Sequence, residues 1–401
     1  MRRLTRALRP LDELVPSPEE RLLVEAVGVA AGGLSDVPAA SSVSDWERVA
    51  QLARAHRVGA VVAHALARTE HRIPAPASAL LGDVAREEFA ATLISRGQLG
   101  AITSALSDAG VPTMLLKGAA LDQVAYPADL PRSMSDLDLL VHEERLQEAV
   151  SVVSGLGYRP FEDAGDPQDA YHVALACEGR IVELHWRITA RGPFRFAPER
   201  IWPRRLDVPA GSSGVFTPCT VDLFVLGAFH YVFQNRFYNG LQSLQDLALL
   251  AGRPGEQAIS GDLARAAQET RSSGAVYWTL CILRDWLGMD VEESTWRLRP
   301  PGFVHDRAAS LLEATFVDAL SHMGARPGSA TGRDRVLWRV ACTSSESPVT
   351  ALSALTTEVL RAPRGGEGGQ RLRTPLSRAL FLLRPTRWSK AWRSLRGDRR
   401  V

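Results

Sequence analysis

The spacing of apolar positions predicts that the first hundred residues are helical. Residues 17–20 (SPEE) combine an N-cap serine, a proline at the first helical position and a glutamate at the third, which is typical of a helix start. Residues 44–47 (SDWE) repeat this signature ahead of an apolar stripe with helical spacing. After two prolines, a further helix is expected from Ala77 to Ala109, ending at Gly110.

The pattern changes to short apolar runs after residue 110. Runs over 111–116 and 137–141 predict two buried strands, with a short helix over 119–124 between them. A second helix is expected over 143–156, and three more strands follow over 158–161, 171–177 and 180–186. Because Glu178 and Gly179 alone separate the last two strands, these should form a hairpin. The predicted order is therefore β-α-β-α-β-β-β, a small mixed sheet with helices packed on it.

Helical spacing returns downstream, which gives an α+β protein whose sheet is flanked by helical regions. Helices are expected between 221 and 360, and the glycine-rich stretch at 364–369 resembles a flexible linker. We predict four parts: an N-terminal helical region (1–110), the mixed-sheet core (111–190), a C-terminal helical region (191–362) and a flexible basic tail (363–401).

Composition narrows the class of protein. The chain has 401 residues, of which 45% are hydrophobic and 23% charged, as in ordinary globular domains. No apolar run approaches the roughly 18–20 residues of a membrane-spanning helix, and the basic N-terminus lacks the apolar stretch of a secretory signal. The four cysteines, Cys177, Cys219, Cys281 and Cys342, lie far apart, which predicts a reducing cytoplasm and no structural zinc.

Charge is distributed unevenly although the net charge is only +2. Residues 361–401 contain twelve Lys or Arg against two acidic residues, whereas the first 360 carry 35 basic and 43 acidic side chains. The tail could be a solvated end, could lie on anionic lipid or could bind nucleic acid. Because Trp388 and Trp392 stand among the arginines, residues 371–401 favour an anionic membrane surface, at the inner face of the membrane, over nucleic acid.

Two aspartates two residues apart are the most informative chemical feature. On a strand Asp136 and Asp138 share one face, roughly 6–7 Å apart along the backbone, while the leucines between and after them point to the core. Neighbouring carboxylates repel each other unless a cation lies between them, so this pair predicts a site for Mg²⁺ or Mn²⁺. Glu183, on the strand over 180–186, supplies a third carboxylate, and His185 should face outward beside it.

A turn between the first strand and the next helix predicts a phosphate site. Gly118 lets a phosphate approach the backbone, the helix N-terminus favours anions, and Lys117 adds a positive charge. Only Lys117 and Lys390 are lysines, so the position is unusual in this arginine-rich chain. Arg132 is a second candidate anion contact. A phosphate cradle beside three metal-binding carboxylates is the set of parts that nucleotidyl transfer requires.

These motifs resemble the uncharacterised nucleotidyltransferase family of the polymerase-β-like superfamily. The resemblance rests on LLKGAAL, Tyr126, Arg132, SDLDLLV, GLGY and VELHW, and on the downstream FVLGAFHYVF and LQSLQDLALL, and it covers roughly Ser44 to Leu250. It implies Asp136, Asp138 and Glu183 as catalytic metal ligands, with Lys117 and Gly118 at the nucleotide phosphates. It implies transfer of a nucleoside monophosphate from a nucleoside triphosphate to an unknown hydroxyl or phosphate acceptor on a small molecule, sugar or protein.

Two departures from the superfamily pattern keep a second hypothesis open. Ala119 follows Gly118 where Ser or Gly is usual, and the third carboxylate is Glu183 where Asp is commoner. A degenerate, non-catalytic binding protein of the same fold, held at a membrane by its tail, is therefore the alternative. A glycosyltransferase would need several βα units ahead of the aspartate pair, and this chain has a single strand there. Further downstream, His230 and Asp246 are expected to pair between helices, with binding of the acceptor substrate as the alternative. A nearby aromatic cluster is expected in the core and not as a base-stacking platform; its members are Phe229, Tyr231, Phe233, Phe237 and Tyr238.

Overall fold

The computed structural model describes residues 6–321, except 70, 72, 162–170, 190–193, 209–212, 254–261, 292–297 and 301. The predicted linker, the basic tail and the helical pattern between 322 and 360 lie outside the described residues, as does Cys342. The three cysteines of the described part are free thiols. No helix within the described ranges is both long enough and apolar enough to cross a bilayer.

A seven-stranded mixed sheet forms one half of the molecule, and its strand order is β3-β4-β5-β2-β1-β7-β6. The neighbours β2 and β5, and likewise β1 and β7, run parallel, whereas the other neighbouring pairs run antiparallel. The strands are β1 (Thr113–Leu115), β2 (Asp136–Leu140), β3 (Arg159–Pro160), β4 (His172–Cys177), β5 (Arg180–His185), β6 (Leu206–Asp207) and β7 (Val215–Thr217).

The helices of the described part frame the sheet and form the rest of the molecule. They are α1 (Leu11–Leu14), α2 (Pro18–Ala30), α3 (Trp46–His56), α4 (Gly59–Arg68), α5 (Ala75–Asp108), α6 (Lys117–Val124), α7 (Leu146–Gly155), α8 (Pro198–Ile201), α9 (Thr220–Ala228), α10 (Leu241–Ala251), α11 (Leu263–Glu269), α12 (Ser273–Asp285) and α14 (Gly302–Ser321). Short 3₁₀ segments lie at η1 (Pro38–Ser42), η2 (Glu143–Arg145) and η4 (Trp202–Arg204), and α9 continues into a π-helical turn, η5 (Phe229–Gln234).

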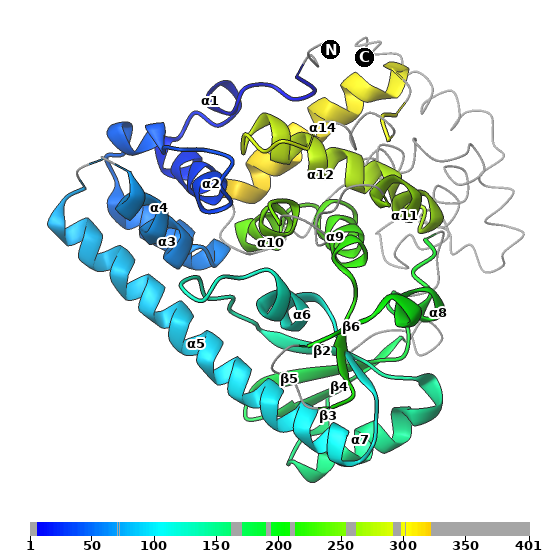
Figure 1. The fold of residues 1–401 in the computed structure, drawn as a ribbon. Coiled ribbons are helices and arrows are strands. Elements are labelled where there is room, and N and C mark those ends of the chain that lie inside the picture. The colour runs from blue at the N-terminus through cyan, green and yellow to red at the C-terminus, as the bar shows by residue number, and fades with distance from the viewer. Residues whose placement is uncertain are drawn as a thin grey trace, which may run out of the picture.

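The long helix α5 connects the two halves of the molecule. It packs on α3 and α4 at one end and on α7 and β1 at the other, and Figure 1 shows it running diagonally from the N-terminal helices to the sheet. Helix α6 lies between β2 and α9, whereas α7 packs against β5 and α5. The sheet therefore contacts the helical half through α6, so a site at the start of α6 lies where the two halves meet (Figure 1).

The predicted α+β architecture is confirmed, and the order β1-α6-β2-α7-β3-β4-β5 is the predicted one. Glu178 and Gly179 both have positive φ, as a two-residue hairpin turn requires. Ser17 caps α2 as expected, but α3 is capped by Asp45 and not by Ser44, because the Asp45 carboxylate accepts from Arg48 N at 2.8 Å. The sheet also continues beyond residue 190, since β7 pairs with β1, and the sequence pattern did not predict β6 or β7. The division of the chain at 110, 190 and 362 stays a prediction.

Helix α4 begins without a capping side chain of its own, and a glutamate from α5 takes that role. The Glu88 carboxylate accepts the backbone N–H groups of Gly59 and Ala60, each at 2.8 Å. These contacts favour the charged carboxylate, but burial outweighs them and raises the pKa of Glu88 to about 7. The folded protein therefore holds a carboxyl that takes up a proton more readily than it does in the unfolded chain.

We expect the contribution of Glu88 to stability to be complete below about pH 4.5 and to be lost as pH rises to about 7. Glu88→Gln removes this titration. As pH rises from 4.5 to 8, the unfolding free energy of the native protein should therefore fall relative to that of the variant. The shift should reach up to about 3 kcal/mol, because one pKa unit corresponds to about 1.4 kcal/mol. Urea unfolding at the two pH values measures it. Glu87→Gln, at an exposed residue paired with Arg54, is the control and should show no such shift; equal pH dependence in native protein and Glu88→Gln would contradict the expectation.

Candidate active site

Two parallel strands bring three carboxylates to one point of the sheet. Asp138 on β2 lies directly opposite Glu183 on β5 in the strand register. Because side chains alternate along a strand, Asp136 shares the face of Asp138. Ligand oxygens of Asp136, Asp138 and Glu183 all lie within 4.8 Å of one another. The structure thus places together the three residues that the sequence pattern selected, and their role as metal ligands stays a prediction.

The same alternation anchors these carboxylates rigidly. Leu137 and Leu139 point to the opposite face of β2, where they are buried in the core. Asp138 is itself buried, with 4% of its side chain exposed, whereas Glu183 keeps 21%. A buried carboxylate is stable only when charged or polar groups compensate for the lost water. The site therefore needs positive partners around Asp138.

Lys117 is the first of these partners. It is the first residue of α6 and has a φ of +42°, a left-handed conformation that is unusual for a lysine. This backbone directs its ammonium group onto Asp138 Oδ1, and Glu183 Oε2 lies 3.8 Å from the same nitrogen. The lysine that the sequence placed at a phosphate turn thus contacts the carboxylates in this structure, and its phosphate contact stays a prediction.

The charges of this cluster shift its pKa values in opposite directions. Burial alone would lower the pKa of Lys117, but the Asp138 carboxylate outweighs burial and raises that pKa above its usual range. Burial would likewise raise the pKa of Asp138, yet Lys117 and His185 hold it well below its ordinary value. Burial and the charge of Asp138 raise the pKa of Asp136. Lys117 and His185 thus stabilise the negative charge of Asp138, whereas burial and the neighbouring Asp138 disfavour the charged form of Asp136.

The expectation that His185 faces outward is wrong. Its side chain is 0% exposed, and its Nε2 lies 3.0 Å from Asp138 Oδ1 and 3.1 Å from Glu183 Oε2. The hairpin register sets His172 directly opposite His185, and its Nε2 lies 3.7 Å from Glu183 Oε1. The spacing of residues gave no role to His172, although pairing the strands outward from the turn at Glu178 sets it opposite His185.

Gly118 lies where a larger residue has no room. A Cβ atom at this position would stand 2.6 Å from Arg132 Nη1 and 3.1 Å from Met134 Cγ. Arg132 is not free to move away, because Asp246 binds its guanidinium through two nitrogens. The glycine of the predicted phosphate turn therefore has a packing reason in addition to its proposed binding role.

We expect Gly118→Ala to destabilise the protein by about 1–3 kcal/mol, the usual cost of overpacking. The added methyl group forces Arg132 from its position against Asp246. Chemical unfolding measures the effect. Gly97→Ala is the matched control, because Gly97 lies within α5 and, apart from the adjacent residues and backbone of that helix, no described atom lies within 4 Å of a Cβ there. That variant should be unchanged or more stable by up to about 1 kcal/mol; equal stability of the two variants would contradict the packing argument.

Arg132 forms a buried ion pair beside the turn. Its Nε donates to Asp246 Oδ1 at 3.0 Å and its Nη2 to Asp246 Oδ2 at 2.7 Å, while Nη1 donates to the carbonyl of Ser133. The hydroxyl of Tyr126 donates to Asp246 Oδ1 at 2.7 Å. These contacts hold the loop before β2 against α10. A contact of Arg132 with phosphate stays a prediction, and in this structure its guanidinium is bound by Asp246.

The expected pairing of His230 with Asp246 is wrong, because Asp246 is bound by Arg132 and Tyr126. His230 lies on the π-helical turn η5, and its buried Nε2 has no hydrogen-bond partner in the described part of the chain. Burial and the charge of Lys117 lower the pKa of His230 to about 3, so its ring is neutral. The neighbouring aromatic residues pack in or against the core as expected, since Phe229, Tyr231 and Phe237 are buried and Phe233 and Tyr238 are half-buried against them.

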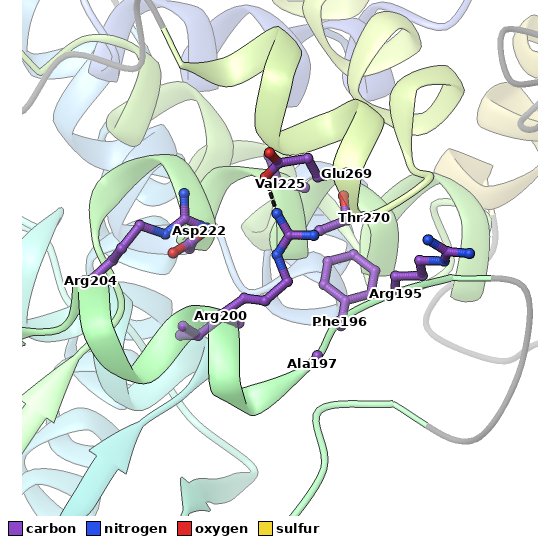
Figure 2. Close-up of a pocket in the computed structure, with 10 residues that line it drawn as sticks. Arg195, Phe196, Ala197, Arg200, Arg204, Asp222, Val225, Glu269 and Thr270 are labelled. Atoms are coloured by element: carbon purple, nitrogen blue, oxygen red, sulfur yellow. Dashed lines mark hydrogen bonds and ion pairs between the residues drawn. The ribbon is translucent and has the colours of Figure 1, made fainter.

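A pocket between α8, α9 and α11 contains none of these residues. Figure 2 shows Arg200 reaching across it to Glu269, and Arg204 beside Asp222. Arg204 Nη2 donates to Asp222 Oδ1 at 2.5 Å, and Arg200 forms an ion pair with Glu269. Because acids already neutralise these two arginines, the pocket is no match for a triphosphate, and the carboxylate cluster remains the candidate active site.

The described structure is an α+β protein whose mixed sheet carries a cluster of three carboxylates. The sequence profile of a family described as uncharacterised nucleotidyltransferases matches residues 42–288, more than half of the chain. The chain therefore belongs to this family, within the polymerase-β-like superfamily. No curated protein matches it. The solution structure of the antibiotic-resistance factor ANT(2'')-Ia is similar at 15% sequence identity and a TM-score of 0.28, covering 48% of this chain and 92% of that chain.

Proposed function

We propose that the protein is a metal-dependent nucleotidyltransferase that moves a nucleoside monophosphate from a nucleoside triphosphate to a hydroxyl or phosphate acceptor. The observation that carries this proposal is the convergence of Asp136, Asp138 and Glu183 within 4.8 Å of one another at the start of α6. In such a reaction the acceptor oxygen bonds to the α-phosphorus while the bond to the departing pyrophosphate breaks. Family membership supports the reaction class, and the acceptor remains unknown.

The residues present fit a hard divalent cation. Three carboxylates supply the oxygen ligands that Mg²⁺ and Mn²⁺ favour. Burial raises the pKa of Asp136, and the negative charge of Asp138 raises it further, a repulsion that a cation would relieve. When bound, the metal stabilises charge on the phosphates and lowers the pKa of the attacking hydroxyl. Asp136, Asp138 and Glu183 would hold it.

The remaining residues bind and orient the triphosphate. Lys117 pairs with Asp138 in this structure, and we propose that it turns to the phosphate oxygens when a cation takes over the carboxylates. The backbone at Gly118 and the N-terminus of α6 then face the phosphates. Arg132 packs against Gly118 and would help indirectly, by holding this turn in position. The flanking helices would form the acceptor site. The protein would be located in the cytoplasm, or at the inner membrane face through residues 371–401.

Calorimetric titration with each of the four nucleoside triphosphates tests the proposal. In the presence of Mg²⁺ or Mn²⁺ we expect at least one of them to bind, and chelation of the metal should abolish the binding. If none of the four binds with either metal, the proposal is wrong. Binding of a triphosphate without release of pyrophosphate, over a panel of hydroxyl and phosphate acceptors, would favour the alternative of a degenerate binding protein.

That alternative has one specific observation in its favour. The residue after Gly118 is Ala119, which offers no hydroxyl to a phosphate, and the ammonium of Lys117 lies on Asp138. If Lys117 stayed there, it would occupy the position of a cation. Lys117→Met separates the two cases: in an enzyme it should weaken triphosphate binding, whereas in a protein whose lysine blocks the site it should strengthen metal binding without turnover.

A further inference from the structure

A second group of metal-binding side chains adjoins the aspartates. His172 on β4 and His185 on β5 face each other across the hairpin, with ring centroids 5.1 Å apart. Glu183 lies on the same face of β5, and one ligand atom from each of the three residues lies within 4.8 Å of the others. Two histidines and one glutamate form the ligand set of catalytic zinc sites, which keep one position open.

The hydrogen bonds of His185 prepare its Nε2 as a ligand. Its Nδ1 lies 3.3 Å from the carbonyl oxygen of Arg187, which can only accept, so Nδ1 carries the hydrogen. Histidines that bind metals are usually held in this way by a backbone carbonyl or a carboxylate. The Nε2 atom then faces Asp138 Oδ1 and Glu183 Oε2 at 3.0 and 3.1 Å. Lys117 already supplies a positive charge to Asp138 Oδ1, whereas His185 Nε2 and Glu183 Oε2, 3.1 Å apart, can share a proton or a cation between them.

The charge and burial of the surroundings suit a divalent ion. Lys117 contacts Asp138 and Glu183, and Arg57 interacts with the charge of Asp136. The three carboxylates still outnumber these two basic groups, so with neutral histidines the cluster favours a further cation before any nucleotide binds. The two imidazoles are enclosed, since the His172 side chain is 11% exposed and that of His185 is 0% exposed, whereas Glu183 opens to solvent at 21%. Glu183 is therefore the most solvent-exposed of the three side chains.

We propose that His172, Glu183 and His185 form a binding site for a borderline transition-metal ion of the Zn²⁺ class, adjoining the aspartate site through Glu183. Imidazole nitrogen suits such ions, whereas Mg²⁺ prefers oxygen ligands and retains its water. The proposal does not require nucleotidyl transfer, because the site needs only the three side chains. Its open position is available to a water molecule or to an oxygen of a bound anion.

Co²⁺ binding to the full-length, chelator-treated protein tests the site. We expect one Co²⁺ per chain without nucleotide, with the strong visible absorption of a four- or five-coordinate ion. His172→Ala should lower the affinity at least about tenfold, since even loss of an outer partner costs that much. His64→Ala, whose ring contacts Asp129 instead, is the control and should bind as the native protein does. Weak octahedral absorption that His172→Ala leaves unchanged overturns the proposal.

A second measurement avoids any change of sequence. In protein labelled with ¹⁵N at histidine, Zn²⁺ should shift ring resonances of two of the nine histidines, and an unchanged spectrum overturns the proposal. Triphosphate titrations of the same samples separate this inference from the proposed function. Nucleotide binding without the histidine–metal site contradicts this inference alone, whereas the metal site without nucleotide binding contradicts the nucleotidyltransferase alone. Asp136→Asn should retain the Co²⁺ spectrum, because Asp136 is not among the three ligands.

Discussion

Asp136→Asn is expected to lower metal-dependent nucleotidyl transfer by at least about 10²-fold, the usual cost of removing a preorganised electrostatic contact to the reacting phosphates. The variant keeps the size of the side chain and the strand, but it replaces a negative ligand by a neutral amide. Pyrophosphate release with the preferred triphosphate measures the loss of turnover. Calorimetry with Mg²⁺ should show weakened nucleotide binding in parallel.

The same variant should not lose stability in the absence of metal. Asp136 has a raised pKa because it is buried and stands beside the negative charge of Asp138, so its charged form opposes folding. Removing that charge relieves the repulsion, and we expect the melting temperature of the free protein to stay unchanged or to rise. Such an opposite effect on activity and stability is typical of functional sites.

A control in the same segment separates loss of charge from loss of the ligand. Asp129→Asn removes a carboxylate whose side chain is 66% exposed and contacts His64, so turnover and nucleotide binding should remain native. Full activity in Asp136→Asn would show that the carboxylate cluster does not hold the catalytic metal. A fall in melting temperature would contradict the account of its repulsion with Asp138.

Asp246→Ala should have the largest effect on stability, a loss of about 3–5 kcal/mol, because it leaves the charge of Arg132 buried without its partner. The two side chains are 11% and 7% exposed, and Tyr126 loses its acceptor in the same variant. The expected loss is a large part of the stability of an ordinary domain. Urea unfolding measures it, with near-ultraviolet circular dichroism to follow the tertiary packing.

Removing both partners separates the ion pair from the packing around it. Arg132→Met combined with Asp246→Leu should recover most of the lost stability, because an apolar pair of similar volume leaves no buried charge. Asp83→Ala breaks an exposed ion pair with Arg86 and should change stability by no more than about 0.5 kcal/mol. If Asp246→Ala cost no more than Asp83→Ala, the pair would not hold α10 against the site.

Much of the sheet and of the site follows from patterns within short segments. The strands β2, β4 and β5 are alternating or apolar runs long enough to show their period, β1 lies within the longer apolar run 111–116, and the turn at Glu178 sets the register of the hairpin. Asp136 and Asp138 share a face of β2 because the period of a strand is two. The aspartate pair and the turn at Lys117 can therefore be predicted from the amino-acid sequence alone.

Contacts between distant segments cannot be predicted in this way. The strands β6 and β7 have two and three residues, too few to show a period, and β7 joins the sheet by pairing with β1 about one hundred residues earlier. Arg132 and Asp246 are 114 residues apart, and several other acids could have matched that arginine. The choice among such partners depends on how the helices pack, and the spacing of residues along the chain does not predict that packing.

The sequence by itself determined which strand presents the aspartates, which turn follows β1 and the family to which the chain belongs. Only the tertiary structure decided that Lys117 lies on Asp138, that Arg132 binds Asp246 and that His172 and His185 close around Glu183. The reason is physical: local periodicity decides which face a side chain takes, whereas a buried charge takes whichever partner the folded chain brings within reach.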